Sequence, residues 1–195
     1  MNVAALDEAR QELLHPARRA LELGLLQELD ERLDDHRVAP SRHDGGLVDF
    51  EDVGFVTLES CVVENAARDG VRLTRCGGAI TRSTIRGAGR GGLFSIDSTG
   101  LVIEDNLVED CADNGVQIWR SAQGVDGTRI VRNRIRRIAA RSGGTGQYGN
   151  GVSIFRAGGV RVERNHVADC AFSALRDNSG HGVRFLENTC LRSGE

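Results

Sequence analysis

The chain has 195 residues and a formal net charge of −3, and it contains 25 glycines but only 2 prolines. This near balance of charge argues against nucleic acid as a partner. The sequence contains no run of 18 apolar residues, so it predicts no membrane-spanning helix. The N-terminus lacks the basic and apolar regions of a signal peptide, so a cytoplasmic location is expected for the chain as written.

Residues 1–45 differ in pattern from the rest of the chain. Four leucines recur at every fourth position from Leu21 to Leu33, and this spacing predicts an amphipathic helix. We expect residues 1–45 to cap the open apolar end of a repeat domain at 46–195, because solenoids need capping for solubility. A helix that mediates self-association is the alternative interpretation.

From residue 46 onward, a short phrase returns every 22 to 23 residues where no insertion intervenes. Each repeat has a turn residue, with one apolar residue three positions before it and another two positions after it. The turn residues are Cys61, Ser83, Asn106, Asn133, Asn165 and Asn188. The apolar residues before the turn are Leu58, Ile80, Ile103, Ile130, Val162 and Phe185, and those after it are Val63, Ile85, Val108, Ile135, Val167 and Cys190. Because strand side chains alternate between faces, both columns are predicted to face one core.

A further strand is predicted to begin nine residues after most turn residues, at a small residue followed by apolar-x-apolar. These strands begin at Gly70, Gly115, Gly151 and Ala174. A fixed period of this size, made of short alternating segments and glycine turns, is typical of a solenoid whose repeats bury their apolar faces on one another. The predicted fold class is therefore all-β: a parallel solenoid of about six coils preceded by an α-helical segment.

Two intervals between turn residues are longer, and they identify insertions at residues 122–127 and 141–149. Insertions in solenoids form surface loops, often beside a binding face. The outward positions after the turns alternate in charge from coil to coil, as in the series Glu64, Arg86, Glu109, Arg136. Stacked strands should pair these charges, so we interpret the arginine-rich run at 129–141 as a paired solvent face rather than a nucleic-acid footprint.

The five cysteines do not show the spacing of a metal or disulfide site. Cys111 and Cys170 fall in one inward column with Ile138 between them, so they are predicted to lie about 10 Å apart and to act as small hydrophobic residues. There is no C-x-x-C pair, and the histidines lack ligand spacing. We expect no metal ligands and no cofactor, with calcium kept open as an option.

The residues around the two insertions resemble a known family. The stretches are Asn-Gly-Val-Gln-Ile-Trp-Arg-Ser at 114–121, Gly-Gly-Thr-Gly-Gln-Tyr-Gly-Asn at 143–150 and Asp-Cys-Ala-Phe-Ser-Ala at 169–174. They are similar to the twin-arginine-translocated β-helix repeat family of proteobacteria, over about residues 53–195. The resemblance implies a right-handed parallel β-helix related to pectate lyases, polygalacturonases and alginate epimerases, and an exported, periplasmic location. Helices replace that family's exported N-terminal region here, and the function implied for the family is itself uncharacterised.

The strands that begin at glycine carry the candidate site. Ile96, Trp119 and Phe155 fall in one outward column, and exposed aromatic rings suit the apolar face of a sugar. The candidate catalytic residues, beside or within the insertions, are Arg120, Arg156, Asp126 and Tyr148. The candidate substrate-binding residues are Asp97, Trp119, Phe155, Gln147 and Arg176. Arginines can pair with uronate carboxylates, while the acids and the tyrosine can transfer protons. Alternatively, Trp119 and Phe155 pack beneath the inserted loops as a satellite core.

Three functional hypotheses follow. The first is a non-catalytic β-helix that binds an acidic polysaccharide along this face. The second is a polysaccharide lyase, epimerase or hydrolase, although neither a second carboxylate near Asp97 nor an acidic calcium cluster is evident. The third is a structural protein that assembles through residues 1–45 or through the open C-terminal coil.

Overall fold

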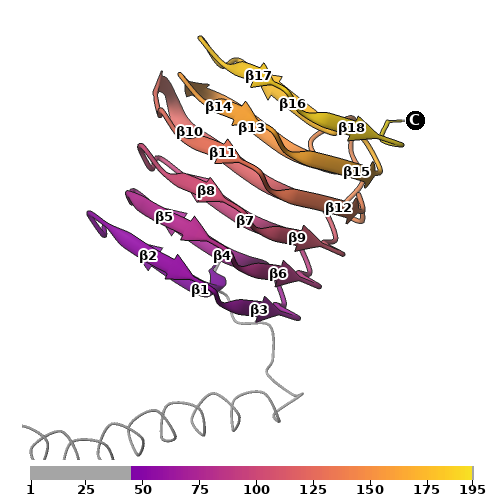
Figure 1. Cartoon of the computed structure of the whole chain (residues 1–195), viewed down its shortest axis with the longest axis horizontal. Helices are drawn as coiled ribbons and strands as arrows, with labels where there is room; N and C mark the ends of the chain where they lie inside the picture. Colours follow the sequence, from indigo (N-terminus) through magenta and orange to yellow (C-terminus); the bar gives the residue numbers. More distant parts are fainter. Residues whose placement is uncertain (1–44, 195) are drawn as a thin grey trace, which may run out of the picture. The chain divides into compact units, whose positions relative to one another are not determined.

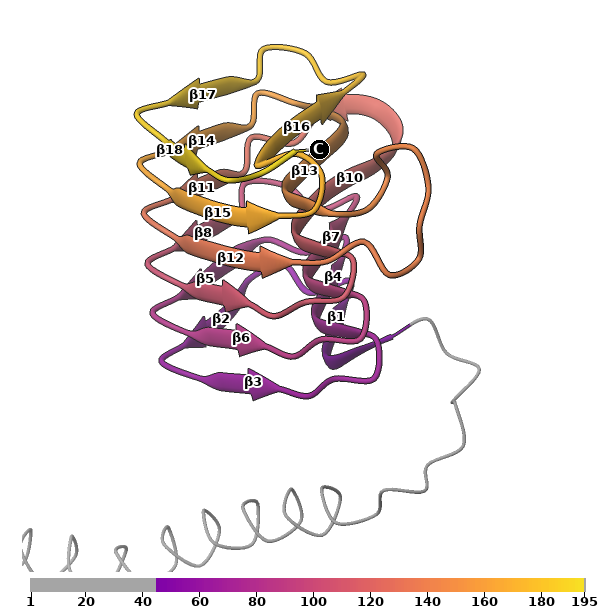
Figure 2. The same cartoon turned by 90° about the vertical axis from the view of Figure 1, so that its right-hand side faces the viewer.

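A computed structural model describes residues 45–194, which form a stack of coils with three strands in each coil (Figure 1). All strand pairs are parallel, and equivalent strands of successive coils build three six-stranded sheets. Figure 2 shows the coils lying one above another, with the loop between β12 and β13 projecting from the stack. The predicted all-β parallel solenoid of about six coils is confirmed. The predicted helical segment at 1–45 lies outside the described residues, and the predicted domain boundary there stays a prediction.

The strands have the following bounds. Sheet A contains β1 (Gly46–Glu51), β4 (Asp69–Thr74), β7 (Gly91–Ile96), β10 (Asn114–Val125), β13 (Asn150–Gly158) and β16 (Leu175–Asn178). Sheet B contains β2 (Val56–Glu59), β5 (Gly78–Thr81), β8 (Val102–Glu104), β11 (Arg129–Val131), β14 (Arg161–Glu163) and β17 (Arg184–Leu186). Sheet C contains β3 (Val62–Glu64), β6 (Thr84–Arg86), β9 (Leu107–Glu109), β12 (Arg134–Ile138), β15 (His166–Cys170) and β18 (Thr189–Leu191).

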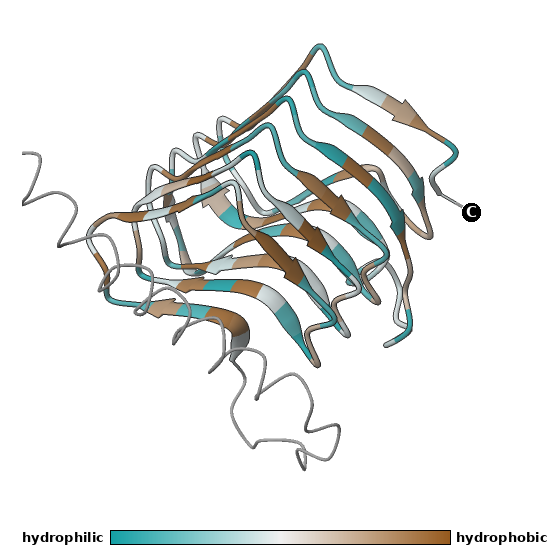
Figure 3. Cartoon of the chain, turned by 60° about the horizontal axis from the view of Figure 1, so that its bottom comes forward, coloured by the Kyte–Doolittle hydropathy of each residue, from teal (hydrophilic) through white to brown (hydrophobic). Residues whose placement is uncertain are grey.

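The strand register confirms the predicted inward columns. Val108 is in register with Ile135, and Ile135 with Val167, and all three side chains are fully buried. Hydrophobic residues therefore recur in bands across successive coils (Figure 3). At the last described coil, Phe185 of the inward column is 41% exposed, because no further described coil covers it.

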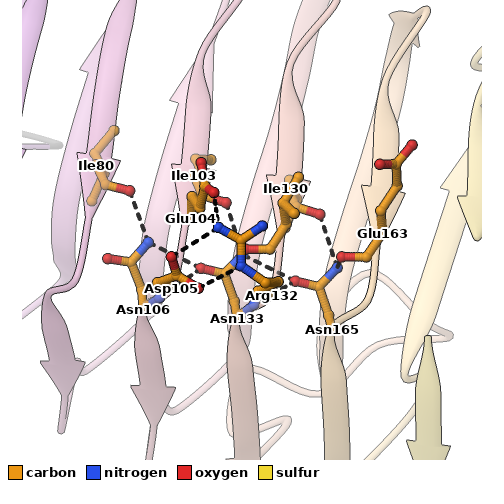
Figure 4. Close-up of polar contacts among 11 residues, drawn as sticks. Ile80, Ile103, Glu104, Asp105, Asn106, Ile130, Arg132, Asn133, Glu163 and Asn165 are labelled. Carbon is orange, nitrogen blue, oxygen red and sulfur yellow. Dashed lines mark hydrogen bonds and ion pairs between the residues drawn. The ribbon is translucent and has the colours of Figure 1, made fainter. Parts of the chain in front are cut away.

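The turn residues between sheets B and C form a hydrogen-bonded ladder through the solenoid (Figure 4). The backbone N–H of Asn106 donates to Asn133 Oδ1 at 2.9 Å, and that of Asn133 donates to Asn165 Oδ1 at 2.8 Å. Each side-chain amide also donates to a backbone carbonyl, as Asn133 Nδ2 does to Ile103 O at 2.8 Å. The ladder satisfies polar groups that the turn buries, so this one column fixes both the turn and the coil register.

Charged residues pair between neighbouring coils at the turns, as predicted. Arg137 binds both carboxylate oxygens of Asp110, at 2.6 and 2.7 Å, and Arg192 binds Asp169 in the same way two coils further along the same column. Arg132 contacts Glu104 and Asp105 of the preceding coil (Figure 4). Three of the arginines in the run at 129–141 therefore have carboxylate partners, since Arg136 also binds Glu109. Arg129 and Arg134 of the same run make no ion pair among the described residues.

The glycine column of sheet A allows close packing against sheet C. A β-carbon added at Gly115 would lie 2.7 Å from Ile135 Cγ2 and 2.5 Å from Gly151 O. Gly92 has the same relation to Val108, whose Cγ1 would lie 2.5 Å away. A branched side chain of sheet C thus rests on the bare backbone of sheet A in coil after coil. Glycine is required at these positions because a β-carbon would lie too close to the neighbouring atoms.

The cysteines behave as the sequence predicts. Cys111 and Cys170 are buried with Ile138 between them, and all five cysteines are free. Burial raises the pKa of Cys111 to about 12, so this thiol stays protonated at neutral pH. Cys111 therefore serves as an apolar core residue.

A second polar column at the start of sheet A contains a buried acid. Asp69 is fully buried, accepts a hydrogen bond from Gly91 N at 3.0 Å and lies 3.7 Å from Arg72. Its Oδ2 has no hydrogen-bond partner, and burial raises the pKa of this carboxyl. Two coils further on, Asn114 accepts the equivalent bond from Asn150 N at 3.0 Å. Asparagine therefore fits the role that Asp69 fills.

We expect Asp69→Asn to stabilise the protein at neutral pH. A folded-state pKa above the unfolded value means that the folded state binds the proton more tightly, so Asp69 costs stability as the pH rises above about 4. Melting temperatures of the wild type and the variant, measured between pH 3 and 8, should diverge in favour of the variant as the pH rises. A difference that is constant with pH would contradict this assignment of the buried carboxyl.

Candidate functional site

The outward face of sheet A carries several of the residues that the sequence singled out. Trp119 is in register with Ile96 on β7 and with Phe155 on β13, so the predicted outward column exists. The neighbouring outward column contains Arg72, Phe94, Gln117, Ser153 and Arg176. The two columns form one face that the insertions flank.

Three aromatic rings on this face contact one another across three coils. The Phe94 and Trp119 centroids are 5.4 Å apart in an edge arrangement, and those of Trp119 and Phe155 are 5.5 Å apart with the rings tilted. The Arg72 guanidinium lies 5.0 Å from the Phe94 centroid, and that of Arg156 lies 4.7 Å from the Phe155 centroid. We call Phe94, Trp119 and Phe155 the aromatic row; it has an arginine at each end.

The aromatic row is partly covered. Phe94 is buried, while Trp119 and Phe155 are half-buried, and Trp119 Nε1 is buried without a hydrogen-bond partner. The satellite-core interpretation therefore describes Phe94 well. Part of Trp119 and Phe155 stays open to solvent and can contact a ligand.

The corner after the aromatic row is a hydrogen-bonded cluster centred on Ser121. Asp97 accepts bonds from Ser121 N at 2.8 Å and from Ser121 Oγ at 2.6 Å, and Arg156 Nη1 donates to Ser121 O at 2.8 Å. Burial alone would raise the pKa of Asp97, but Ser121 and the Arg120 guanidinium hold it below its usual range. Asp97 is therefore an ionised turn-stabilising group, which is not the state of a general acid at neutral pH.

Arg120 and Asp126 lie deeper in the same corner. Arg120 Nη1 donates to Ser98 O at 3.3 Å, and its Nε is buried without a hydrogen-bond partner. Asp126 is 2% exposed and accepts a bond from Thr128 N at 3.0 Å. Burial raises the pKa of Asp126 more than Thr128 and Arg120 lower it. Asp126 is thus a buried carboxyl without direct access to the outward face.

The first insertion, residues 122–127, was predicted to form a surface loop, but the structure differs. Strand β10 continues to Val125, and its register with β13 shifts between Trp119 and Gly124. Such an irregularity bends the strand locally. Gln123 then donates to Ser179 O at 3.1 Å, so the extension reaches the corner of the last described coil.

The second insertion, residues 141–149, lies at the opposite end of the sheet A strands. Asp113 accepts bonds from Ser142 N at 2.8 Å and from Ser142 Oγ at 2.7 Å, and Asn114 Nδ2 donates to Gln147 O at 3.2 Å. The Arg176 guanidinium lies 6.0 Å from the Phe172 centroid and packs against Gly146. Tyr148 is half-buried in this loop.

The structure therefore divides the predicted site residues into two groups. Trp119, Phe155, Asp97, Arg120, Arg156 and Asp126 lie at one end of the strands, and Gln147 and Tyr148 lie at the other. Arg176 lies between the two groups, because it is in register with Ser153 while its guanidinium packs against Gly146 of the second insertion. Phe155 lies five positions after Asn150 along β13, which corresponds to about 16 Å. Tyr148 and Asp126 consequently do not meet at one reaction centre.

Sequence reasoning missed Phe94, Ser121 and Phe172 in these groups. Phe94 stands two positions before Ile96, so the strand alternation already places it on the outward face. Ser121 contacts the two neighbouring coils through Asp97 and Arg156, and Phe172 contacts the second insertion at Gly149, and a single sequence offers no signal for these contacts.

The described residues hold no cluster of three or more His, Cys, Asp or Glu side chains suited to a metal ion. Calcium therefore stays a hypothesis without a ligand set in residues 45–194. No helix among those residues is long and apolar enough to span a membrane.

These features define a parallel β-solenoid with a candidate ligand-binding face on sheet A. The family described as "Right handed beta helix region" matches residues 31–190, and the chain therefore belongs to the right-handed β-helix family. This match is to the broad group and does not single out the twin-arginine-translocated family. No curated protein and no solved structure matches the chain.

Proposed function

We propose that the outward face of sheet A binds an acidic polysaccharide without cleaving it. The aromatic row, with Arg72 beside one end and Arg156 beside the other, carries this proposal. Half-buried rings offer an apolar surface to a sugar, and guanidinium groups suit uronate carboxylates. The resemblance of residues 53–195 to the twin-arginine-translocated β-helix family, and through it to polysaccharide-active β-helices, supports the same ligand class. That narrower membership and an exported location are part of the proposal.

Binding fits the geometry better than catalysis does. The enzymatic alternative, a lyase, epimerase or hydrolase, would use Arg120, Arg156, Asp126 and Tyr148. Asp126 is buried, and Tyr148 lies at the other end of the strands. Asp97 is held ionised by Ser121 and Arg120, so it offers no second proton donor near Asp126. A reaction on this face would need a catalytic set other than these four residues.

Assembly is the second candidate function. In the last described coil, Phe185 and Leu186 are each 41% exposed and Leu191 is 39% exposed. Their strands, β17 and β18, each pair with only one described neighbour. Apolar side chains beside open strand edges favour association with another chain. Light scattering over a range of concentrations, together with a glycan titration, separates the two candidates.

Fluorescence of Trp119, the only tryptophan, tests the binding proposal. We expect a saturable change in its emission when an oligogalacturonate is added, and we expect Phe155→Ala to weaken that response about tenfold. Phe55→Ala is the matched control, because Phe55 is 73% exposed and precedes sheet B. An unchanged spectrum with uronate and neutral oligosaccharides, with and without calcium, would contradict the proposal and leave the aromatic row a packing feature.

A further inference from the structure

Sheet B carries a column of three arginines on its outward face. Arg129 on β11 is in register with Arg161 on β14, which is in register with Arg184 on β17. Parallel strands place such neighbours about 4.8 Å apart along the stack. All three residues are exposed, and we call them the arginine column.

The arginine column departs from the charge pairing seen elsewhere in the solenoid. Arg132, Arg137 and Arg192 each bind a carboxylate of the preceding coil. Within the arginine column only Arg161 has a carboxylate partner, and that partner is Glu163 of its own strand, at 2.6 Å. The side chains of Arg129 and Arg184 make no ion pair or hydrogen bond among residues 45–194. Like charges stacked on neighbouring strands destabilise a sheet, so folding does not explain this column.

The surface beside the arginine column is hollowed and polar. A depression of about 140 Å³ is lined by Arg161, Glu163, Arg164, Leu186 and Glu187. Glu163 is bonded to Arg161 and Glu187 to Arg164, so both carboxylates of the depression are already neutralised by arginines. An anionic ligand would meet Arg129 and Arg184 as the guanidinium groups still without a carboxylate.

We propose that the arginine column binds a linear polysaccharide carrying carboxylate or sulfate groups, laid across β11, β14 and β17. Anionic groups of the polymer pair with Arg129 and Arg184, whose guanidiniums can each form two parallel hydrogen bonds to a carboxylate or a sulfate. Arg161 between them keeps its bond to Glu163 and adds its positive charge to the column. This site lies on a different sheet from the aromatic row, so it can be tested independently of the function proposed for sheet A.

The chemistry of this face favours a polysaccharide over single-stranded nucleic acid. The outward residues of the three strands are Arg129, Val131, Arg161, Glu163, Arg184 and Leu186. None of them is aromatic, whereas proteins that bind single strands stack bases on aromatic side chains. A column of guanidiniums alone suits a polymer that is recognised through its charges.

Calorimetric titration of the full chain with an oligogalacturonate and with dextran sulfate, at low salt, tests this inference. Arg184→Glu should weaken binding about tenfold, because it replaces one of the three cations by an anion. Arg134→Glu is the matched control and should change binding less than about twofold. Arg134 is also exposed and makes no ion pair among the described residues, but it lies on sheet C in register with Leu107 and His166. Both variants change the net charge from −3 by −2, to −5.

The two ligands distinguish a carboxylated from a sulfated polymer, and binding of either that depends on Arg184 supports the inference. Absence of binding to both would overturn it, as would equal losses in the Arg184 and Arg134 variants, which would mean a response to net charge alone. Tighter, Arg184-dependent binding of oligothymidylate would overturn the polysaccharide assignment.

Trp119→Ala distinguishes the two proposed sites and should leave binding to the arginine column unchanged. If it abolishes all binding while Arg184→Glu does not, the sheet A proposal survives and this one fails.

Discussion

Asn133→Ala should lower the free energy of unfolding by about 3 to 5 kcal/mol, because several buried polar groups lose their partners at once. Asn133 Oδ1 accepts bonds from the backbone N–H and the side-chain amide of Asn106, at 2.9 and 3.0 Å. Asn133 Nδ2 donates to Ile103 O, Val131 O and Asn165 Oδ1. Alanine leaves the Asn106 N–H buried and unsatisfied, and it interrupts the ladder at its centre. Urea unfolding followed by circular dichroism measures the loss.

Asn188→Ala is the control for this prediction. Asn188 accepts the equivalent bond from Asn165 N at 2.9 Å, but it is half-buried in the last described coil. Water can replace the lost bonds there, so we expect a cost of about 1 kcal/mol. Equal costs at the two positions would show that burial of the ladder contributes little. Each coil of a solenoid is stabilised mainly by contacts with its two neighbouring coils. The loss of the Asn133 contacts should therefore make unfolding less cooperative and broaden the urea unfolding transition.

Much of the solenoid follows from short-range rules that a single sequence contains. Alternation of side chains along a strand places Ile80, Ile103 and Ile130 inward, and the fixed period then stacks them. The pairing of Arg137 with Asp110 follows in the same way, since neighbouring coils place like positions side by side. The core columns and the charge pairs were therefore predictable residue by residue.

The candidate site was less predictable, because it depends on departures from the repeat. Counting positions placed Trp119 and Phe155 in one column, but it could not show that β10 runs on to Val125. The role of Asp97 depends on Ser121, which lies 24 residues away in the chain. Burial of Asp126 likewise depends on how the first insertion folds back. The repeat therefore predicts which column a residue occupies, whereas the insertions determine its environment.

The arginine column was predictable in part. The expected alternation of charge holds for the turns between sheets B and C and those after sheet C, where Asp105 meets Arg132 and Asp110 meets Arg137. The same counting of positions places Arg129, Arg161 and Arg184 together on sheet B, where the alternation fails. The failure of the charge alternation on sheet B, and not the total charge, identifies the surface that we propose for binding.

Gly115→Ala should cost about 2 to 3 kcal/mol, a large effect for the addition of one methyl group. The added carbon would lie 2.5 Å from Gly151 O and 2.7 Å from Ile135 Cγ2, and neither neighbour can move freely. Gly151 belongs to the adjacent strand of sheet A, and Ile135 is fully buried. The backbone of β10 must shift away from sheet C to make room. Because Trp119 lies four residues further along β10, its emission should change together with the stability.

Gly54→Ala is the matched control for the contact with sheet C. Gly54 lies between β1 and β2, and a β-carbon there would have no heavy atom within 4 Å. We expect its effect on unfolding to stay within about 0.5 kcal/mol, and the Trp119 emission to stay unchanged. Similar unfolding free energies for the two variants would refute the role assigned to the glycine column. A loss confined to Gly115→Ala, together with a changed Trp119 emission, would support the role of the glycine column in positioning the strand that carries the aromatic row.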